Sequence, residues 1–271
     1  MLLRDLFALL ALQPRPLLQA RAQVRCLASG AAGDSIRLDK LLAERGVGSR
    51  KDVDRLIRSG AVTVDGELVG KAGAKLKVPW LSAPEVDGIA YPPPPLLAAY
   101  HKPLGVVSSM RDERNRPDLS AVLPLGWRTL HPVGRLDADT TGLLLFCRAG
   151  ELTHKLLHPK FEVEREYIAV VENPIDEAAL GATLASGVST IEDGAELVVP
   201  AQLVSVEGQA VTLTVTEGKH RMVRRILANA GHPVVELHRV RYGEIVLGDL
   251  GQGESAAVEG EPLEWALGLK A

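Results

Sequence analysis

Apolar positions predict two short helices in the first third of the folded chain. Between residues 36 and 42, leucine and isoleucine recur on one face of a helix, and glycines follow this segment. Ser49, with Asp52 three residues later, has the form of a capping box that begins a second helix. Gly60 ends this helix in the position that glycine favours. Its predicted buried stripe consists of Val53, Leu56 and Ile57.

The rest of the pattern predicts strands interspersed with a few helices. Asp65-Gly66 is a two-residue hairpin signal between strands at 61–64 and 67–69. Further strands are expected at 96–100, 143–146, 164–170, 203–206, 210–215, 234–240 and 242–247. Helices are expected at 151–158 and 176–185, and a third ends at Ala230. Four consecutive prolines, 92–95, favour a stiff extended conformation and predict a linker between two domains.

One apolar run stands directly after a dense polar loop. Leu143 to Phe146 are typical of a strand buried on both faces. The loop before them contains Arg135, Asp137, Asp139, Thr140 and Thr141 and is closed by Gly142. A buried strand fixes the geometry of such a loop, which makes it a candidate place for chemistry. The alternative is a tight turn, with Asp and Thr side chains bonding nearby backbone amides.

Composition limits what the chain can do. With 271 residues and a formal net charge of -3, the chain is not a polycation, so a nucleic-acid surface would have to be a local patch. Cys26 and Cys147 are far apart, which provides neither a disulfide framework nor metal-ligand spacing. No stretch is long and apolar enough to span a bilayer, and no phosphate-cradling glycine loop is present.

The first 33 residues differ from the rest and predict an organelle transit peptide. Arg4, Arg15, Arg21 and Arg25 stand against one acid, Asp5, in a segment otherwise rich in leucine and alanine. Val24-Arg25-Cys26 followed by small residues resembles a plastid processing site, whereas the shortage of Ser and Thr fits a mitochondrion. The balance falls slightly toward a plastid, and an unprocessed cytosolic tail is the remaining alternative.

The loop and strand together resemble a known catalytic signature. Gly134-Arg135-Leu136-Asp137-x-Asp139-Thr140-Thr141-Gly142-Leu-Leu-Leu is similar to the signature of the Rsu/Rlu pseudouridine synthases, and His101-Lys102-Pro103-x-Gly105 is similar to the opening motif of that family. The resemblance implies a mixed α+β catalytic domain with a largely antiparallel sheet and an active site in a cleft across it. It also implies isomerisation of a uridine within RNA, a reaction that requires no cofactor and no metal.

The same resemblance assigns roles to individual residues. Asp137 is the expected catalytic carboxylate, either as nucleophile at the anomeric carbon or as base at the neighbouring sugar carbon. Arg224, the first arginine of Val-Arg-Arg, is expected to pair with Asp137, and Tyr167 to pack against the uracil. Leu237 is expected to line the pocket and Arg135 to contact RNA. Met222 departs from the family, which often has glutamine there.

The two helices and hairpin resemble the S-four-type RNA-binding module. The second helix carries four basic residues on its polar face, and Lys71, Lys75 and Lys77 follow the hairpin. The four helix residues are Arg50, Lys51, Arg55 and Arg58. A solvated helix face is the alternative, but the resemblance favours contacts with RNA phosphates.

We therefore expect a monomeric, membrane-independent pseudouridine synthase that acts on ribosomal RNA in pre-ribosomal particles. The expected parts are a leader (1–33), an RNA-binding domain (34–91), a linker (92–95), a catalytic domain (96–250) and a tail (251–271). A non-catalytic ribosome-assembly protein on the same fold is the rival reading. A nuclease that holds a metal with Asp137 and Asp139 would need further acids at suitable spacing, which the sequence lacks.

Overall fold

A computed structural model describes residues 35–71, 73–77, 84–91, 94–110, 116–119, 122, 127, 129–192 and 194–270. The described residues divide into two compact units, each with its own core. The N-terminal unit contains the described residues up to Pro95 together with those between 123 and 131, and the C-terminal unit contains the described residues of 96–122 and 132–270. The predicted leader lies outside the described residues, as do Pro92 and Pro93 of the predicted linker.

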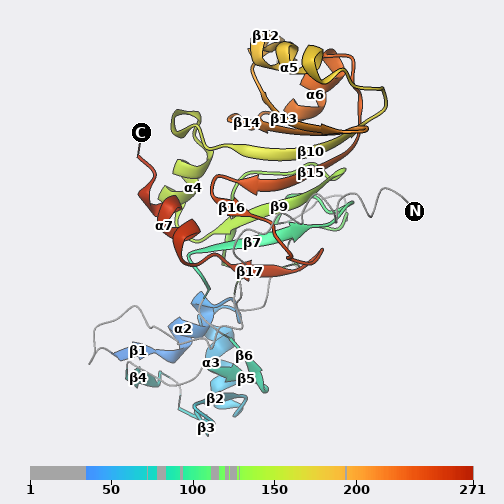
Figure 1. Ribbon diagram of the computed structural model, residues 1–271. Coiled ribbons are helices and arrows are strands. Elements are labelled where there is room, and N and C mark those ends of the chain that lie inside the picture. Colours follow the sequence, from blue (N-terminus) through green and yellow to red (C-terminus); the bar gives the residue numbers. More distant parts are fainter. Residues whose placement is uncertain are drawn as a thin grey trace. The chain divides into compact units, whose positions relative to one another are not determined.

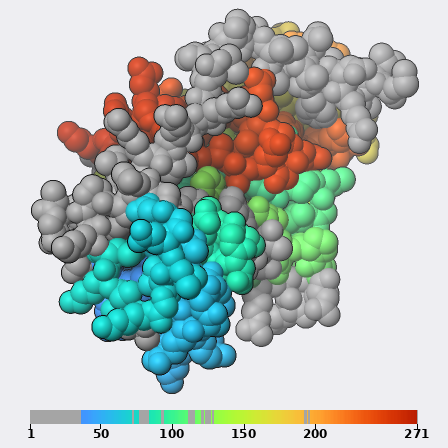
Figure 2. Space-filling model, turned by 90° about the horizontal axis from the view of Figure 1, so that it is seen from below, coloured from blue at the N-terminus to red at the C-terminus, as the bar shows by residue number. Residues whose placement is uncertain are grey.

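The N-terminal unit contains the two predicted helices and the predicted hairpin (Figure 1). Its helices are α2 (Leu38–Glu44) and α3 (Arg50–Arg58). A sheet in the order β3-β2-β5-β6 is built from β2 (Val62–Val64), β3 (Glu67–Leu68), β5 (Glu85–Val86) and β6 (Ile89–Ala90). A separate pair joins β1 (Ser35–Arg37) to β4 (Lys75–Lys77). The blue-to-cyan surface in Figure 2 belongs to this unit.

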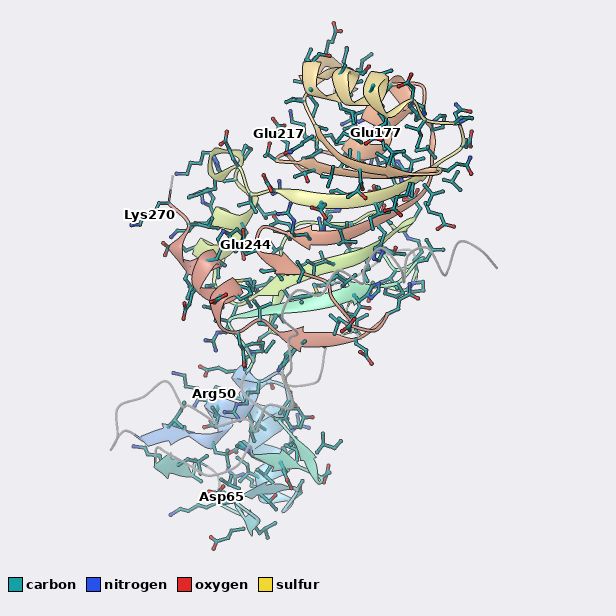
Figure 3. The ribbon with its side chains drawn as sticks, in the orientation of Figure 1. Arg50, Asp65, Glu177, Glu217, Glu244 and Lys270 are labelled. Carbon is teal, nitrogen blue, oxygen red and sulfur yellow. The ribbon has the colours of Figure 1, made fainter. Side chains whose placement is uncertain are left out.

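Local sequence explains these elements. Ser49 caps α3 in a reciprocal capping box with Asp52, as predicted. Asp65 and Gly66 both have positive φ, 53° and 80°, the conformation that a two-residue hairpin turn requires (Asp65 is labelled in Figure 3). Val53 and Ile57 are fully buried, so the helix presents the predicted apolar stripe to the core.

The C-terminal unit is organised around one large mixed sheet in the order β13-β14-β10-β15-β9-β7-β17, with β16 paired to β15 and β8 to β9. Its strands are β7 (Leu97–Lys102), β8 (His131–Pro132), β9 (Thr140–Cys147), β10 (Arg165–Val171), β13 (Gln202–Glu207), β14 (Ala210–Val215), β15 (Val234–Tyr242), β16 (Ile245–Val246) and β17 (Ser255–Ala257). Along the seven-strand path, only β9 and β15 run parallel, so the sheet is largely antiparallel, as expected.

Helices accompany this sheet. They are α4 (Gly150–Leu157), the 3₁₀ turn η3 (Pro159–Phe161), α5 (Glu177–Ser186), α6 (Met222–Asn229) and α7 (Glu261–Gly268). A separate hairpin joins β11 (Val188–Glu192) to β12 (Ala195–Val199) and contacts α6. The sequence did not predict this hairpin. In Figure 1, α5 and α6 lie beside the β13–β14 edge of the sheet and α4 and α7 lie together at one end of it.

The parallel pair β9 and β15 lies at the centre of the sheet. Leu143 to Phe146 are fully buried, which confirms the prediction of a strand covered on both faces. Gly142 has φ +104° and pairs with Arg239. A Cβ atom at Gly142 would lie 2.2 Å from the carbonyl oxygen of Arg239, so only glycine lets the two backbones approach this closely.

The segment at 251–271, for which the sequence predicted no element, contains a strand and a helix. β17 pairs with β7 at one end of the sheet, and Ala266 of α7 is fully buried in the main core. Residues 242–247 do not form one strand, because Gly243 has φ +56° and reverses the chain before β16. Residues 251–271 are rich in glycine and glutamate and show no apolar period, whereas the turn at Gly243 interrupts an apolar run that otherwise resembles one strand.

Candidate active site

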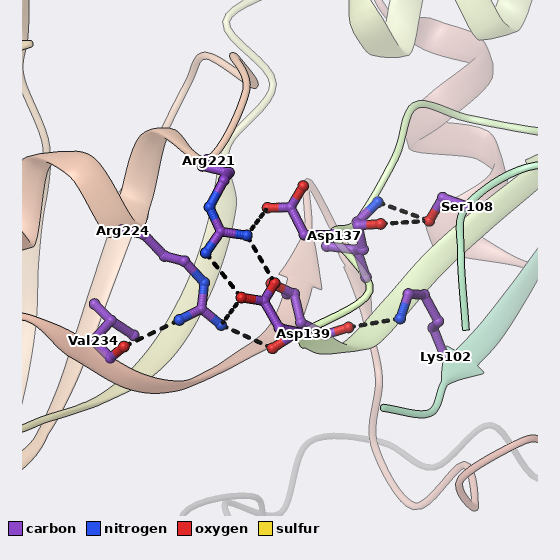
Figure 4. A network of polar contacts seen from close by, with 9 residues as sticks. Lys102, Ser108, Asp137, Asp139, Arg221, Arg224 and Val234 are labelled. Atoms are coloured by element: carbon purple, nitrogen blue, oxygen red, sulfur yellow. Dashed lines mark hydrogen bonds and ion pairs between the residues drawn. The ribbon is translucent and has the colours of Figure 1, made fainter. Parts of the chain in front are cut away.

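The predicted catalytic loop is fixed on both sides of Asp137. The buried hydroxyl of Ser108 accepts a hydrogen bond from the backbone N–H of Leu136 (3.0 Å) and donates one to its carbonyl oxygen (2.7 Å). Beyond Asp137, the ammonium of Lys102 donates to the carbonyl oxygen of Thr140 at 2.8 Å (Figure 4). Because β7 and β9 are paired strands of the sheet, these contacts hold the loop to a rigid support.

Arg221 connects the two acids of the loop. Its Nη1 and Nη2 donate to the two carboxylate oxygens of Asp139 at 3.0 and 2.8 Å (Figure 4). Nη1 also lies 3.8 Å from Oδ2 of Asp137. Arg221 has the left-handed φ of 50° and immediately precedes α6. This position directs its side chain toward a loop 82 residues earlier in the sequence.

Arg224 does not take the place that the sequence predicted for it. Its Nη2 donates to the backbone oxygen of Asp139 at 2.8 Å and lies 3.5 Å from the carboxylate of the same residue. Its Nη1 donates to Val234 on β15 at 3.1 Å. Within the described part of the chain, the guanidinium that forms an ion pair with Asp137 is that of Arg221. Arg224 instead ties α6 to β15 and to the loop.

These contacts set the charge state of the network. Partial burial alone would raise the pKa of Asp139, but hydrogen bonds from Arg221 and the charge of Arg224 outweigh burial and hold that pKa below its usual range. The hydrogen bonds to Asp139 raise the pKa of Arg221. Burial lowers the pKa of Lys102 to about 8, although Asp137 and Asp139 oppose the shift. The loop is therefore held by groups whose charges depend on one another.

A pocket of about 390 Å³ opens beside Asp137. It brings together Asp137, Tyr167, Leu237 and Arg135, four of the residues that the sequence assigned to the site. Tyr167 on β10 and Leu237 on β15 are 8% and 6% exposed, so each presents only an edge to the cavity. Met222 also lines the pocket, and among the described lining residues Arg221 is present whereas Arg224 is not.

Two buried arginines that line the pocket, Arg165 and Arg239, were not identified from the sequence. Arg239 donates to the carbonyl oxygen of Leu143 (2.7 Å) and to the hydroxyl of Tyr167 (3.3 Å). Arg165 donates to the hydroxyl of Tyr242 at 2.9 Å, and that hydroxyl donates to Leu156 at 2.7 Å. Polar residues that alternate with apolar ones in a strand usually indicate a face exposed to solvent, so no local pattern revealed that these side chains are buried.

Comparison with known proteins identifies the family. Residues 97–229 match the family described as RNA pseudouridylate synthase, and residues 36–78 match the S4 domain. The ribosomal small subunit pseudouridine synthase A of Escherichia coli (strain K12) is 39% identical over 233 residues, which cover 81% of this chain and 94% of that protein. The chain belongs to the RNA pseudouridine synthase family.

Two further relatives support this assignment. The ribosomal large subunit pseudouridine synthase B of Bacillus subtilis (strain 168) is 35% identical over 224 residues, which cover 81% of this chain and 90% of that protein. A crystal structure of a pseudouridylate synthase superposes with a TM-score of 0.58 at 30% identity and covers 85% of this chain and 99% of that one. The chain is thus a pseudouridine synthase with an N-terminal S4 domain, which confirms the expected activity and fold class.

The basic face of the S4 domain is less uniform than the sequence suggested. Arg50 (labelled in Figure 3) forms an ion pair of 2.8 Å with Asp39, a carboxylate that is nearly fully buried and is also held by Arg37. Hydrogen bonding from Arg37 and from Arg50 keeps the pKa of Asp39 well below its usual range. Arg50 is thus part of the domain's packing as well as of its surface.

The other three basic residues of α3 are exposed. Arg58 forms an ion pair with Asp54 at 3.1 Å, and Arg55 pairs with Asp52. Lys51 has no ion pair among the described residues. Exposed ion pairs contribute little to stability, so these three side chains can exchange their partners for phosphates at small cost.

Within the described residues, no three His, Cys, Asp or Glu side chains are placed to hold a metal ion. No helix in that part of the chain is long and apolar enough to cross a bilayer.

Proposed function

We propose that this synthase converts a uridine of ribosomal RNA to pseudouridine and that Asp137 is its catalytic carboxylate. The single observation that carries the proposal is the shared pocket: Asp137, Tyr167 and Leu237 come from three different segments and line one cavity. A carboxylate for the ribose and an aromatic ring with an apolar side chain for the base are the groups that such a reaction needs.

The target base must leave the RNA stack to reach Asp137. Flipping a nucleotide costs a few kcal/mol and delivers the base into a pocket where stacking replaces its lost neighbours. The ring of Tyr167 packs against the uracil, and Leu237 completes the apolar wall. The carboxylate of Asp137 then acts on the ribose, either at the anomeric carbon or at the neighbouring carbon.

Arg221 positions the reacting carboxylate. Its guanidinium is anchored on Asp139 and lies 3.8 Å from the carboxylate of Asp137, which orients that carboxylate toward the pocket. Lys102 and Ser108 hold the backbone on either side, so the carboxylate does not need to be ordered when RNA binds. The hydroxyl of Tyr167 is available to assist removal of the proton from carbon 5.

The substrate class is argued from the relatives and the S4 domain. Relatives of this chain include a large-subunit and a small-subunit ribosomal pseudouridine synthase, at 35% and 39% identity. Both align over at least 90% of their own length, so they share the two-domain organisation. Ribosomal RNA is therefore the substrate that we propose, bound through phosphate contacts from the S4 domain.

The test of Asp137 uses a purified assay. Asp137→Asn keeps the size and hydrogen bonding of the side chain but removes its charge, so we expect RNA binding without pseudouridine formation. Asp249→Asn, an exposed acid of the same unit, is the matched control and should retain the wild-type rate. Turnover by Asp137→Asn near the wild-type rate would show that Asp137 is not the catalytic carboxylate.

A second experiment tests the substrate. Pseudouridines are mapped in ribosomal RNA from cells with and without the protein, and identical maps would refute ribosomal RNA as the substrate.

A further inference from the structure

The pocket is lined by two buried arginines that form no ion pair with a described residue. Arg165 and Arg239 are 4% and 3% exposed, and both line the cavity. Their hydrogen bonds go to carbonyl oxygens and to the hydroxyls of Tyr167 and Tyr242. Among the residues that the structure describes, neither arginine forms an ion pair with a carboxylate. Nη2 of Arg239 is buried and has no hydrogen-bond partner in the same part of the chain.

These side chains form a compact group on two paired strands. Tyr167 is the cross-strand neighbour of Arg239, and Arg165 is the cross-strand neighbour of Tyr242. The ring of Tyr242 contacts both guanidinium groups, and its centroid lies 4.9 Å from that of Arg165 and 5.2 Å from that of Arg239. Cation–π contact compensates part of the charge, but a buried cation normally has an anionic partner. By contrast, the buried acid Asp39 in the S4 domain has two arginines.

The position of the group shows which anion it suits. Leu237 and Arg239 are two residues apart on β15 and therefore point to the same face of the sheet. Arg239 also bonds the hydroxyl of Tyr167, so the positive charge lies beside the residues that receive the base. The backbone phosphates of an RNA substrate have more accessible partners than the buried arginines, because Arg135 and Arg221 line the pocket and are exposed. The buried charges are thus matched to the base itself.

The reaction generates an anion at this place. When the bond between the anomeric carbon and N1 breaks, both bonding electrons leave with the uracil, which becomes an anion whether Asp137 attacks the sugar or removes a sugar proton. The bond from the anomeric carbon to C5 then forms, C5 loses its proton, and N1 gains one, so the product is an isomer of the substrate. Nothing is oxidised or reduced.

We propose that the Arg165–Tyr242–Arg239 group stabilises the detached uracil anion and holds it in the pocket while it turns. This proposal rests on the proposed function. The two guanidinium groups are fixed before the substrate arrives, so they need no reorganisation when charge develops. Their burial away from water strengthens their effect on a charge that exists only after the bond has broken. They act on the base, whereas Asp137 acts on the sugar.

The experiment compares two substrates in single-turnover reactions at saturating RNA. One RNA carries uridine at the target position, and the other carries 5-fluorouridine, whose fluorine withdraws electrons and makes the detached base a more stable anion. The measured event is loss of the N-glycosidic bond. Arg239→Gln should slow this event on uridine about 10²- to 10³-fold, the range for removing one oxyanion donor. On 5-fluorouridine the defect should shrink by about tenfold or more.

Arg239→Lys is the matched control, because it keeps the charge and loses the planar fork. It should recover most of the rate and leave RNA affinity and its salt dependence unchanged. Equal defects of Arg239→Gln on both substrates would overturn the proposal. Loss of affinity with a shallower salt dependence would also overturn it, since this result would indicate phosphate binding. Failure of the wild-type protein to convert either substrate would instead refute the proposed function, and the anion proposal with it.

A measurement on the wild-type protein decides the matter if Arg239→Gln does not fold. Free 5-nitrouracil is far more acidic than uracil and resembles it in shape. We expect inhibition by 5-nitrouracil to strengthen as the pH rises through its own ionisation and to exceed inhibition by uracil by about tenfold or more. Equal inhibition by the two bases at all pH values would overturn the proposal.

Discussion

Arg221 holds the carboxylate of Asp139 through two hydrogen bonds of 3.0 and 2.8 Å, so Asp139 serves as the anchor of the arginine. The second acid of the loop therefore has a function distinct from that of Asp137. It fixes a positive charge 3.8 Å from Asp137 without itself lining the described pocket.

This anchoring predicts different effects for the two arginines of α6. Arg221→Ala should lower kcat/KM, because Asp137 loses the guanidinium 3.8 Å from its carboxylate and Asp139 loses two hydrogen bonds. We expect a loss of about fivefold, because both side chains of the ion pair are partly exposed. Arg221→Lys should be only partly tolerated, since lysine lacks the planar fork that binds Asp139. The measurement is kcat/KM at neutral pH.

Arg224→Ala is the contrasting variant. It removes hydrogen bonds that join α6 to Val234 and to the backbone of Asp139, so it should lower Tm more than Arg221→Ala does and lower kcat/KM less. A larger loss of kcat/KM for Arg224→Ala than for Arg221→Ala, at temperatures where both variants are folded, would show that Arg224 is the true partner of Asp137.

The lowered pKa of Lys102 predicts that the stability of the protein depends on pH. Burial lowers its pKa in the folded protein to about 8, below the value near 10.4 that is usual for an unfolded chain. Between these two pH values the unfolded state therefore binds more protons than the folded state. The free energy of unfolding rises with pH in this range, because the buried lysine loses its unfavourable charge. Relative to Lys102→Met, the free energy of unfolding of the wild type should increase by about 2 kcal/mol between pH 7 and pH 9.5.

Denaturant unfolding of both proteins at the two pH values provides this comparison. Lys102→Met leaves two carbonyl oxygens without their donor, which lowers its stability at every pH and so cancels from the difference. A constant difference across this range would mean that Lys102 does not titrate there.

The S4 domain predicts a salt-dependent contribution to RNA affinity. Lys51, Arg55 and Arg58 are exposed on α3, and replacing all three with alanine should weaken binding of single-stranded RNA. Each lost phosphate contact should reduce the slope of log affinity against log salt by about 0.7. The single-turnover rate at saturating RNA should change little, because the pocket lies in the other unit.

Arg50 is kept in this variant because it neutralises the buried Asp39. Arg50→Ala alone is the control for stability and should lower the Tm of the S4 domain. An unchanged salt slope in the triple variant would mean that this face does not contact RNA. A collapsed saturating rate would mean that the domain helps to form the active site.

The composition of residues 1–33 predicts that they direct the protein into an organelle. A fusion of residues 1–33 to a fluorescent protein should accumulate in a plastid or a mitochondrion. Replacing Arg4, Arg15, Arg21 and Arg25 with glutamate removes the positive charge that import requires and should leave the fusion in the cytosol. A diffuse signal from the unaltered fusion would refute the prediction.

The sequence predicted those parts of the site that are encoded locally. Asp137, the glycine after its loop and the buried strand are neighbours in the chain, so one motif contains them all. Arg221 reaches the loop across 82 residues and owes its direction to a left-handed backbone, which no local pattern reveals. Resemblance to the family indicated Arg224, whereas the chain itself places Arg221 next to Asp137.

The same distinction explains the rest of the fold. The capping box at Ser49 and the turn at Asp65-Gly66 were predictable because their hydrogen bonds join near neighbours. β17 was not, because it is a three-residue strand whose partner, β7, lies about 150 residues earlier in the chain. Arg165 and Arg239 were missed because the pattern of a strand does not reveal that both of its faces are covered.

The close approach of two backbones at Gly142 determines what a mutation at this position would do in a cell. Any other residue would bring its Cβ to 2.2 Å from the carbonyl oxygen of Arg239 and would force β9 and β15 apart. The loop of Asp137 and the wall of Leu237 and Arg239 would then separate together, while the S4 domain, with its own core, would remain folded. In a cell that also makes the intact protein, such a copy would bind RNA through its S4 domain without modifying it. A single codon change at Gly142 would thus create a dominant-negative allele.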